Sequence, residues 1–179
     1  MLNPKNTALV IIDVQGKLAR IMQKADDLFK NLAMLIKGAR LLEVPIIWME
    51  QLPNKLGSTV AEVSEHLDGL QPIAKGVFSC GQNAEFNATL DEINPENVVL
   101  AGIETHVCVY QSAMDLLKKN YNVEVVADAT STRLEHNKEI GLEKIHRAGG
   151  QITSVETALF ELQGKASGDR FKQLLEIIK

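Results

Sequence analysis

Three residues of this chain have side chains suited to acyl-transfer chemistry: Asp13, Lys75 and Cys108. A thiolate is a strong nucleophile, a carboxylate can take up and release a proton, and an ammonium group stabilises a neighbouring anion. The three residues are far apart in the sequence, so they can act together only if the fold gathers the segments that carry them. Each also has an ordinary structural explanation, as a turn residue, a solvated surface group and a buried core thiol respectively.

Cys108 follows a short apolar run, residues 98–101, which is typical of a buried strand and which we expect Gly102 to end. Thr105 stands where the N-cap of the next helix is expected, so Cys108 would lie in the first helical turn. Free backbone N–H groups and the helix dipole would lower the pKa of the thiol there. A buried core cysteine is the alternative, and both interpretations remain open on this stretch alone.

Apolar runs alternate with amphipathic segments along the chain, which predicts an α/β fold with a mainly parallel sheet in a single domain, residues 1–179. The expected strands are residues 7–12, 46–50, 98–101, 122–127 and 151–155. The clearest expected helices are residues 26–42, 83–93, 134–148, 157–162 and 169–178, and residues 59–67 are a candidate for a further short helix. Asp13 directly follows the first strand, and the ligand crevice of such sheets lies beyond the carboxyl ends of the strands. Lys75 lies in a segment that Pro72, Gly76 and Gly81 exclude from regular helix.

Composition excludes several classes of function. The chain has 179 residues, of which 45% are hydrophobic and 23% charged, and its formal net charge of −4 argues against a nucleic-acid or anionic-membrane surface. No apolar run is long enough to span a bilayer, and the N-terminus lacks the features of a signal peptide. Two cysteines do not make a disulfide framework, so we expect a reducing, cytoplasmic location.

Five segments together resemble the isochorismatase-like cysteine hydrolase superfamily, which includes nicotinamidases and N-carbamoyl amidohydrolases. They are IIDVQ at Asp13, the Lys75 loop, AGIETHVCV around Cys108, VVADATSTR at Asp128, and ITSVETALFEL. The loop that begins QLP at Gln51 and the C-terminal RFKQLLEIIK are most similar to the isochorismatase-domain-containing subgroup. The resemblance implies a three-layer α-β-α sandwich with Rossmann-like topology.

The resemblance also implies a mechanism and a substrate class. Cys108 would attack a carbonyl carbon and form a thioester, Asp13 would act as general base and then acid, and Lys75 would pair with Asp13 and stabilise the thiolate. The backbone N–H groups of Glu104 and Cys108 would hold the oxyanion, and the Ile103–Glu104 peptide would be cis. The substrate would be a small molecule with an amide or carbamoyl C–N bond.

Departures from the nicotinamidase pattern narrow this expectation. Nicotinamidases carry an Asp and several His metal ligands after the second strand, where this chain offers Glu50 and no histidine before His66. We therefore expect no metal and no cofactor. Leu18 stands where nicotinamidases carry a ring-stacking aromatic, so nicotinamide is not the expected substrate. Together with Leu18, three further residues are candidates for the wall of the substrate pocket: Gln15, Trp48 and Phe78. A turn hydrogen bond is the alternative role for Gln15.

A second hypothesis is a non-enzymatic role, in which the fold serves as an oligomeric scaffold or as a redox-responsive protein with a reactive thiol. An acid–base pair beside the thiol favours the hydrolase, because a scaffold does not need one. Oligomers are common in the superfamily, so a homo-oligomer is expected under either hypothesis.

Overall fold

The computed structural model describes all residues from Met1 to Lys179. Six parallel strands form one sheet in the order β3-β2-β1-β4-β5-β6. Their bounds are β1 Thr7–Ile12, β2 Ile46–Gln51, β3 Ile73–Lys75, β4 Asn97–Ile103, β5 Asn122–Ser131 and β6 Gln151–Thr153. The chain builds outward from β1 on one side and from β4 on the other, so the topology switches between these two strands. Ligand crevices of open α/β sheets lie at the carboxyl side of such a switch.

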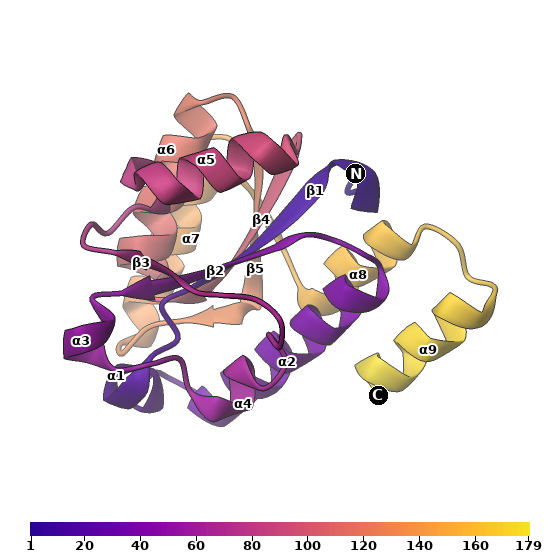
Figure 1. The fold of residues 1–179 in the computed structure, drawn as a ribbon, viewed down its shortest axis with the longest axis horizontal. Coiled ribbons are helices and arrows are strands. Elements are labelled where there is room, and N and C mark those ends of the chain that lie inside the picture. The colour runs from indigo at the N-terminus through magenta and orange to yellow at the C-terminus, as the bar shows by residue number, and fades with distance from the viewer.

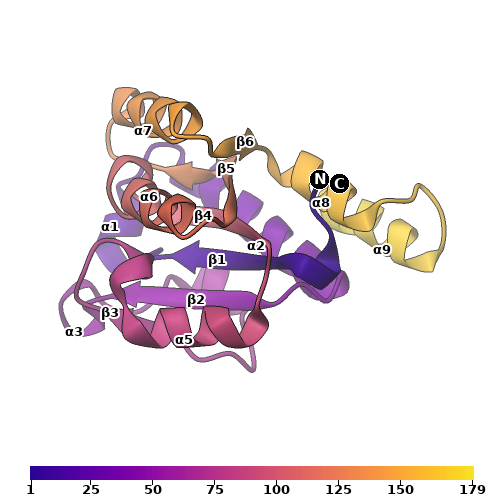
Figure 2. The same cartoon turned by 90° about the horizontal axis from the view of Figure 1, so that it is seen from above.

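Helices cover both faces of the sheet, as Figures 1 and 2 show, which confirms the three-layer α-β-α sandwich. The bounds are α1 Gly16–Arg20, α2 Ala25–Leu41, α3 Pro53–Leu56, α4 Ala61–Ser64, α5 Ala84–Ile93, α6 Tyr110–Lys118, α7 Glu135–Arg147, α8 Val155–Gln163 and α9 Asp169–Ile178. One face is covered by α2 and α8, and the other by α5, α6 and α7. The last helix, α9, packs against α2 at the outside of the molecule.

The continuous apolar run of β1 is explained by burial on both faces. Leu9 and Ile11 point into the core beneath α2 and α8, whereas Val10 and Ile12 point into the core beneath α5 and α6. All residues of β1 are buried. A strand covered on both sides loses the alternation of polar and apolar residues that marks a half-exposed strand.

Two strands run further than the sequence predicts. β4 continues through Gly102, whose φ of +120° suits glycine and whose absent side chain leaves room for the carbonyl oxygen of Ile12. β5 continues past Asp128 to Ser131 through a register shift, so Asp128 does not end its strand. The Asp128 carboxylate accepts a hydrogen bond from Val155 N at 2.9 Å and so ties β5 to α8. Gly102 and Asp128 are of residue types that often end a strand, but here each lies inside a strand that is locally irregular.

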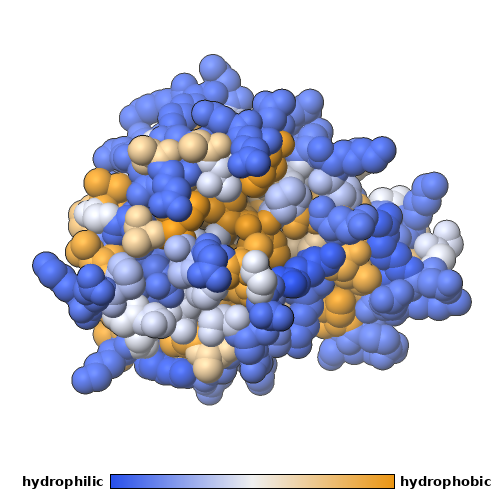
Figure 3. Space-filling view, in the orientation of Figure 1, coloured by the Kyte–Doolittle hydropathy of each residue, from blue (hydrophilic) through white to orange (hydrophobic).

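The surface carries both hydrophobic and hydrophilic areas. Figure 3 shows hydrophobic atoms exposed across the middle of one face, between hydrophilic regions above and below. No helix combines the length and the apolar character needed to cross a membrane.

Candidate active site

The three candidate catalytic residues meet at the carboxyl edge of the sheet. Asp13 follows β1, Lys75 is the last residue of β3, and Cys108 lies in a π-helical turn, Thr105–Val109, just after β4. All three are buried, with exposed fractions of 2%, 3% and 8% respectively. The topology switch between β1 and β4 therefore brings the carboxylate and the thiol together, as the sequence predicts.

Lys75 is the centre of a dense hydrogen-bond network. Its Nζ donates to Oδ2 of Asp13 at 2.7 Å and to Oε1 of Gln51 at 2.6 Å. The backbone oxygens of Val77 and Phe78 accept from the same ammonium group at 3.1 and 3.0 Å. A buried ammonium group needs such partners, since each replaces part of its lost hydration. The predicted pairing of Lys75 with Asp13 is present in the structure.

Cys108 is held differently from the expectation. Glu104, not Thr105, is the cap of the turn, and the Thr105 hydroxyl donates to the Ser131 carbonyl at 3.1 Å. The placement of Thr105 as N-cap is therefore wrong by one residue, because its hydroxyl ties the turn to β5. The Cys108 Sγ lies 3.9 Å from Oε1 of Gln51, at the floor of a cavity.

Of the two interpretations of Cys108 left open by the sequence, the one with a lowered thiol pKa is contradicted. Burial raises the pKa of Cys108, the neighbouring Asp13 carboxylate raises it further, and the Lys75 ammonium only partly opposes both. Burial likewise raises the pKa of Asp13, against the effect of Lys75. Desolvation of the thiolate outweighs the lysine and the helix terminus. The thiol and the carboxylate therefore both have raised pKa values, and Oδ1 of Asp13 is buried without a hydrogen-bond partner.

The cavity above Cys108 has a volume of about 200 Å³. Its lining is formed by Asp13, Leu18, Gln51, Leu52, Lys55, Leu56, Phe78, Ile103, Glu104, Val107 and Cys108. Most of the lining residues are hydrophobic, and the polar ones are Asp13, Gln51, Lys55 and Glu104. Of the four predicted wall residues, Leu18 and Phe78 lie in this lining, and Gln15 and Trp48 do not.

Gln15 and Trp48 instead hold the segment 52–58, which forms one wall. The fully buried Gln15 carboxamide accepts from Gln51 N at 2.6 Å and donates to the carbonyl oxygens of Gln51 and Gly57 at 3.1 and 2.6 Å. At the far end of the segment, Trp48 Nε1 donates to the Thr59 hydroxyl at 2.8 Å. The prediction that these two side chains face the substrate pocket is wrong, because both are engaged beneath its wall.

At Glu104 the backbone N–H is free to bind a ligand, whereas the carboxylate is already paired within the protein. The Ile103–Glu104 peptide is cis, as predicted. The Glu104 N–H donates to no group of the protein, whereas the side chain pairs with Arg133 Nε at 3.0 Å. His106 lies beside Glu104 and Asn137 and does not line the cavity.

Gln51 is the site residue that sequence analysis missed. It ends β2, the strand next to β1, and its carboxamide lies between Lys75 and Cys108. The available signal was its position at the carboxyl end of a strand beside the one that carries Asp13. The sequence analysis applied this signal to the strand that carries Asp13 and not to the end of the neighbouring strand.

The Glu50 carboxylate, which stands in the region of the nicotinamidase metal ligands, is used inside the protein. Its Oε1 accepts from the backbone N and the hydroxyl of Thr59 at 2.7 and 2.8 Å. His66 pairs with Glu65 at 3.3 Å. Glu50 thus anchors the end of segment 52–58.

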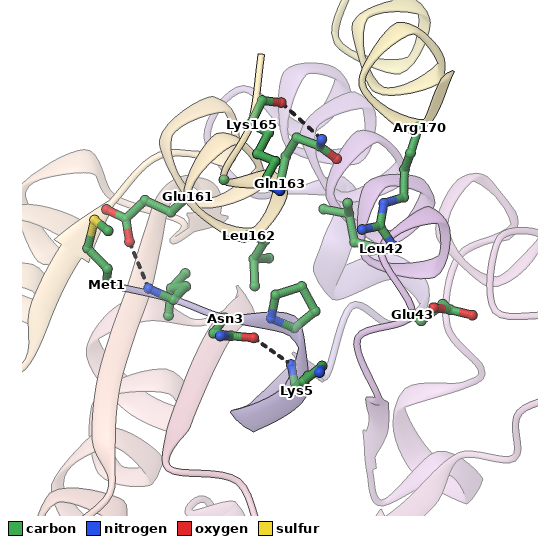
Figure 4. Close-up of a pocket in the computed structure, with 13 residues that line it drawn as sticks. Met1, Asn3, Lys5, Leu42, Glu43, Glu161, Leu162, Gln163, Lys165 and Arg170 are labelled. Atoms are coloured by element: carbon green, nitrogen blue, oxygen red, sulfur yellow. Dashed lines mark hydrogen bonds between the residues drawn. The ribbon is translucent and has the colours of Figure 1, made fainter. Parts of the chain in front are cut away.

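A larger cavity of about 540 Å³ lies elsewhere (Figure 4), between the N-terminal segment, the start of the α2–β2 connection and the end of α8. Met1 and Glu161 lie at its edge, and Leu2 N donates to the Glu161 carboxylate at 2.9 Å. None of the candidate catalytic residues lines it. It sits near the amino end of β1, so we place the active site in the smaller cavity at the carboxyl edge.

Comparison with known proteins agrees with this fold and identifies a family. The model of the isochorismatase domain matches residues 7–157. The chain is 36% identical to the secreted isochorismatase effector Isc1 of Phytophthora sojae, over 98% of this chain and 86% of that protein. It is 35% identical to isochorismatase domain-containing protein 1 of Danio rerio over 99% of its own length, but spans only 62% of that relative.

Solved structures give the same result. The MAR1 ribonuclease from Caenorhabditis elegans has a TM-score of 0.93 and 35% identity, with 99% of this chain and 91% of that chain covered. YcaC of Escherichia coli, described as an octameric hydrolase of unknown specificity, shares the fold at a TM-score of 0.92 and 22% identity, over 98% and 89% of the two chains. With a family match over most of its length and relatives above 30% identity, the chain belongs to the isochorismatase family of hydrolases.

Proposed function

We propose that this protein is a metal-independent cysteine hydrolase that cleaves C–N bonds of small amides or carbamoyl compounds. The observation that carries the proposal is that Cys108 and Asp13 line one cavity, while the buried Lys75 ammonium pairs with Asp13 directly behind that lining. A nucleophile, a basic carboxylate and a fixed cation are the groups that acyl transfer through a thioester requires. A pure scaffold has no need to bury an ion pair beside a thiol, since burial of charge is costly.

The first half of the reaction uses the open oxygen of Asp13. Oδ1 takes the proton from Sγ as the sulfur attacks the carbonyl carbon, and the backbone N–H groups of Glu104 and Cys108 receive the developing oxyanion. Collapse of the tetrahedral intermediate breaks the C–N bond, and Asp13 returns the proton to the leaving nitrogen. The acyl group is then a thioester on Cys108, and the amine or ammonia departs.

The second half repeats the proton transfers with water. Asp13 removes a proton from a water molecule as that water attacks the thioester carbon. The C–S bond breaks, the acid product leaves, and the Cys108 sulfur regains the proton. Throughout, Lys75 remains positively charged, holds Oδ2 of Asp13 and lowers the energy of the transient thiolate.

The cavity supports a small substrate. A volume of about 200 Å³ lies below the ~300–1,000 Å³ that is typical of ligand pockets. The C. elegans neighbour is described as a ribonuclease. A ribonuclease would bind phosphates through clustered cations, whereas Lys55 is the only lysine or arginine in the lining of this cavity and the chain carries a net charge of −4. RNA is therefore the negative control in the assay below.

The test is Asp13→Asn, measured as ammonia or amine release across a panel of small amides and N-carbamoyl compounds. Asparagine keeps the volume and an oxygen for Lys75, so the variant should fold, but it cannot accept the thiol proton. We expect turnover to fall by at least ~100-fold, with Asp68→Asn, an exposed aspartate without partners, as the matched control. An Asp13→Asn variant that hydrolyses a substrate at the parent rate would refute the mechanism. Removal of divalent cations with a chelator should leave the rate unchanged.

We also propose that the chain forms a homo-oligomer in the cytoplasm. The hydrophobic surface in Figure 3 supports the first part, as does the octameric assembly described for YcaC. Light scattering coupled to size exclusion tests it, and a monomer at all concentrations would contradict it. One relative is named a secreted effector, so fractionation of the source cells tests the location.

A further inference from the structure

Gln51 reaches both the ion pair and the nucleophile. Its side chain is part of the cavity lining, yet the residue is only 8% exposed. Oε1 accepts from Lys75 Nζ at 2.6 Å and lies 3.9 Å from Cys108 Sγ. A neutral carboxamide in this place is not needed to balance charge, because Asp13 already neutralises Lys75.

The orientation of the Gln51 carboxamide is fixed by its neighbours. An ammonium group only donates hydrogen bonds, so the oxygen of the amide must face Lys75. The nitrogen is left on the other side, where Nε2 donates to no group of the protein, and it is not sealed in the protein interior. Gln15 holds the Gln51 backbone at both N and O, so the side chain starts from a rigid base. The cavity therefore contains an unused, pre-oriented N–H₂ donor near the sulfur.

The neighbouring groups leave one role for this donor. In the proposed reaction the carbonyl oxygen goes to backbone N–H groups, and the leaving nitrogen goes to the open Oδ1 of Asp13. The third substituent of the carbonyl carbon is the acyl chain, which must lie along the remaining lining, where Gln51 is the neutral polar residue. Leu18, Phe78 and Val107 offer it only apolar contact.

We propose that Gln51 is a specificity-determining residue of this hydrolase. Its Nε2 donates a hydrogen bond to a second oxygen beside the scissile carbonyl, so the preferred substrates are amides with an α-keto, α-hydroxy or adjacent carboxyl oxygen. This inference rests on the proposed function in taking Cys108 as the reacting atom. A donor with no protein partner selects for a ligand acceptor, because a ligand without one leaves the desolvated N–H₂ group unpaired.

Two alkylating probes test this without a known substrate. In iodoacetamide the carbonyl oxygen lies two bonds from the carbon that sulfur attacks, as the second oxygen of the proposed substrates does, whereas allyl bromide has no acceptor. Both react with the same thiolate, so the ratio of their rates cancels any change in the pKa of Cys108. Labelling of Cys108 is followed by intact mass in a Cys80→Ala background, since Cys80 is fully buried among apolar side chains.

Gln51→Met should lower the iodoacetamide-to-allyl-bromide ratio by about fivefold, the equivalent of one net hydrogen bond of ~1 kcal/mol. Gln51→Glu keeps an oxygen for Lys75 but turns the donor into an acceptor, so it should lower the ratio at least as much. It also serves if the methionine variant does not fold. Gln173→Glu, an exposed residue of α9, carries the same charge change away from the cavity and should leave the ratio unchanged.

A ratio that is the same in the parent and in a folded Gln51 variant overturns the proposal and leaves the hydrolase mechanism intact. If neither probe labels Cys108 of the parent protein at any pH, both the Gln51 proposal and the hydrolase mechanism are refuted. The cavity would then not deliver a carbon electrophile to the sulfur. A reduced ratio in a protein that hydrolyses no amide would instead keep the Gln51 contact and count against the proposed function.

Discussion

Replacing Lys75 by methionine should destabilise the protein strongly, and in a way that depends on pH. The Lys75–Asp13 pair has an N···O distance of 2.7 Å, with side chains 0% and 3% exposed. Methionine keeps the aliphatic length but leaves the Asp13 carboxylate buried without its cation. Breaking a buried pair in this way costs ~3–5 kcal/mol. For a chain of 179 residues, that corresponds to a fall in Tm of roughly 6–20 °C.

The sign of the pH dependence follows from the carboxyl group. Burial already raises the pKa of Asp13, and Lys75 opposes that rise. In Lys75→Met the cation that opposes this rise is absent, so the pKa of Asp13 in the folded protein rises further above its unfolded value of ~3.9. The folded variant then holds a proton that the unfolded chain has released. Its stability falls as pH rises from about 4 through the raised pKa, so the deficit should be largest at about pH 8 and smallest in acid.

Urea unfolding followed by the fluorescence of Trp48, the single tryptophan, measures the effect at each pH. Asp13→Asn/Lys75→Met should recover most of the lost stability at about pH 8 and abolish the pH dependence, because the unpaired charge is removed. Activity should not return. Lys172→Met removes an exposed ion pair, with side chains 76% and 90% exposed, and should change little. A loss below ~1 kcal/mol for Lys75→Met, or no recovery in the double variant, would refute the reasoning.

Three further predictions concern the thiol, the support of the cavity wall and the strand that carries the turn. Alkylation of Cys108 by iodoacetamide should be slow at neutral pH and keep rising above the ordinary thiol pKa of ~8.5, because burial raises its pKa. Gln15→Leu should cost about 3 kcal/mol in urea unfolding and reduce turnover, since it leaves the buried backbone of Gln51 unpaired. Gly102→Ala should cost at least ~3 kcal/mol, measured the same way, because a Cβ would overlap the carbonyl oxygen of Ile12.

Each of these has a clear contrary result. An alkylation rate that levels off below about pH 8 would show an activated thiol and restore the lowered pKa. Unchanged stability in Gln15→Leu would mean that segment 52–58 is held by its other anchors alone. Gly69→Ala is the control for the glycine variant: φ is +80° there as well, but a Cβ meets nothing within 4 Å. Equal losses at both positions would mean that backbone strain, and not the collision, is responsible.

The sequence was sufficient for the layer architecture and for the gathering of the candidate triad. Continuous apolar runs gave the buried strands, and the rule that ligands lie at carboxyl ends placed Asp13 correctly. Both are local or topological signals. The extension of β4 through Gly102 was missed because a glycine inside a strand and a glycine that ends one look the same in sequence.

The errors at the site share one physical cause. The pKa of Cys108 depends on how far the surrounding chain removes water, which periodicity does not report. Gln15 was assigned to the pocket wall because it lies two residues after Asp13, and Trp48 because aromatic residues are scarce in this chain. Their hydrogen-bond partners include Gly57 and Thr59, whose positions are set by tertiary contacts. Gln51 was missed because a neutral amide becomes informative only once the ammonium group beside it is seen.

Segment 52–58 has a consequence for how such a site can diversify. The segment contributes Leu52, Lys55 and Leu56 to the cavity, whereas it is attached through Gln51 and Thr59 at its two ends and through the backbone oxygen of Gly57. The three lining side chains of the segment can therefore be replaced while its two ends, and the reactive residues Asp13 and Cys108, keep their positions. Grafting a different seven-residue sequence between the same anchors offers a direct route to hydrolases that accept new substrates while Asp13, Lys75 and Cys108 stay unchanged.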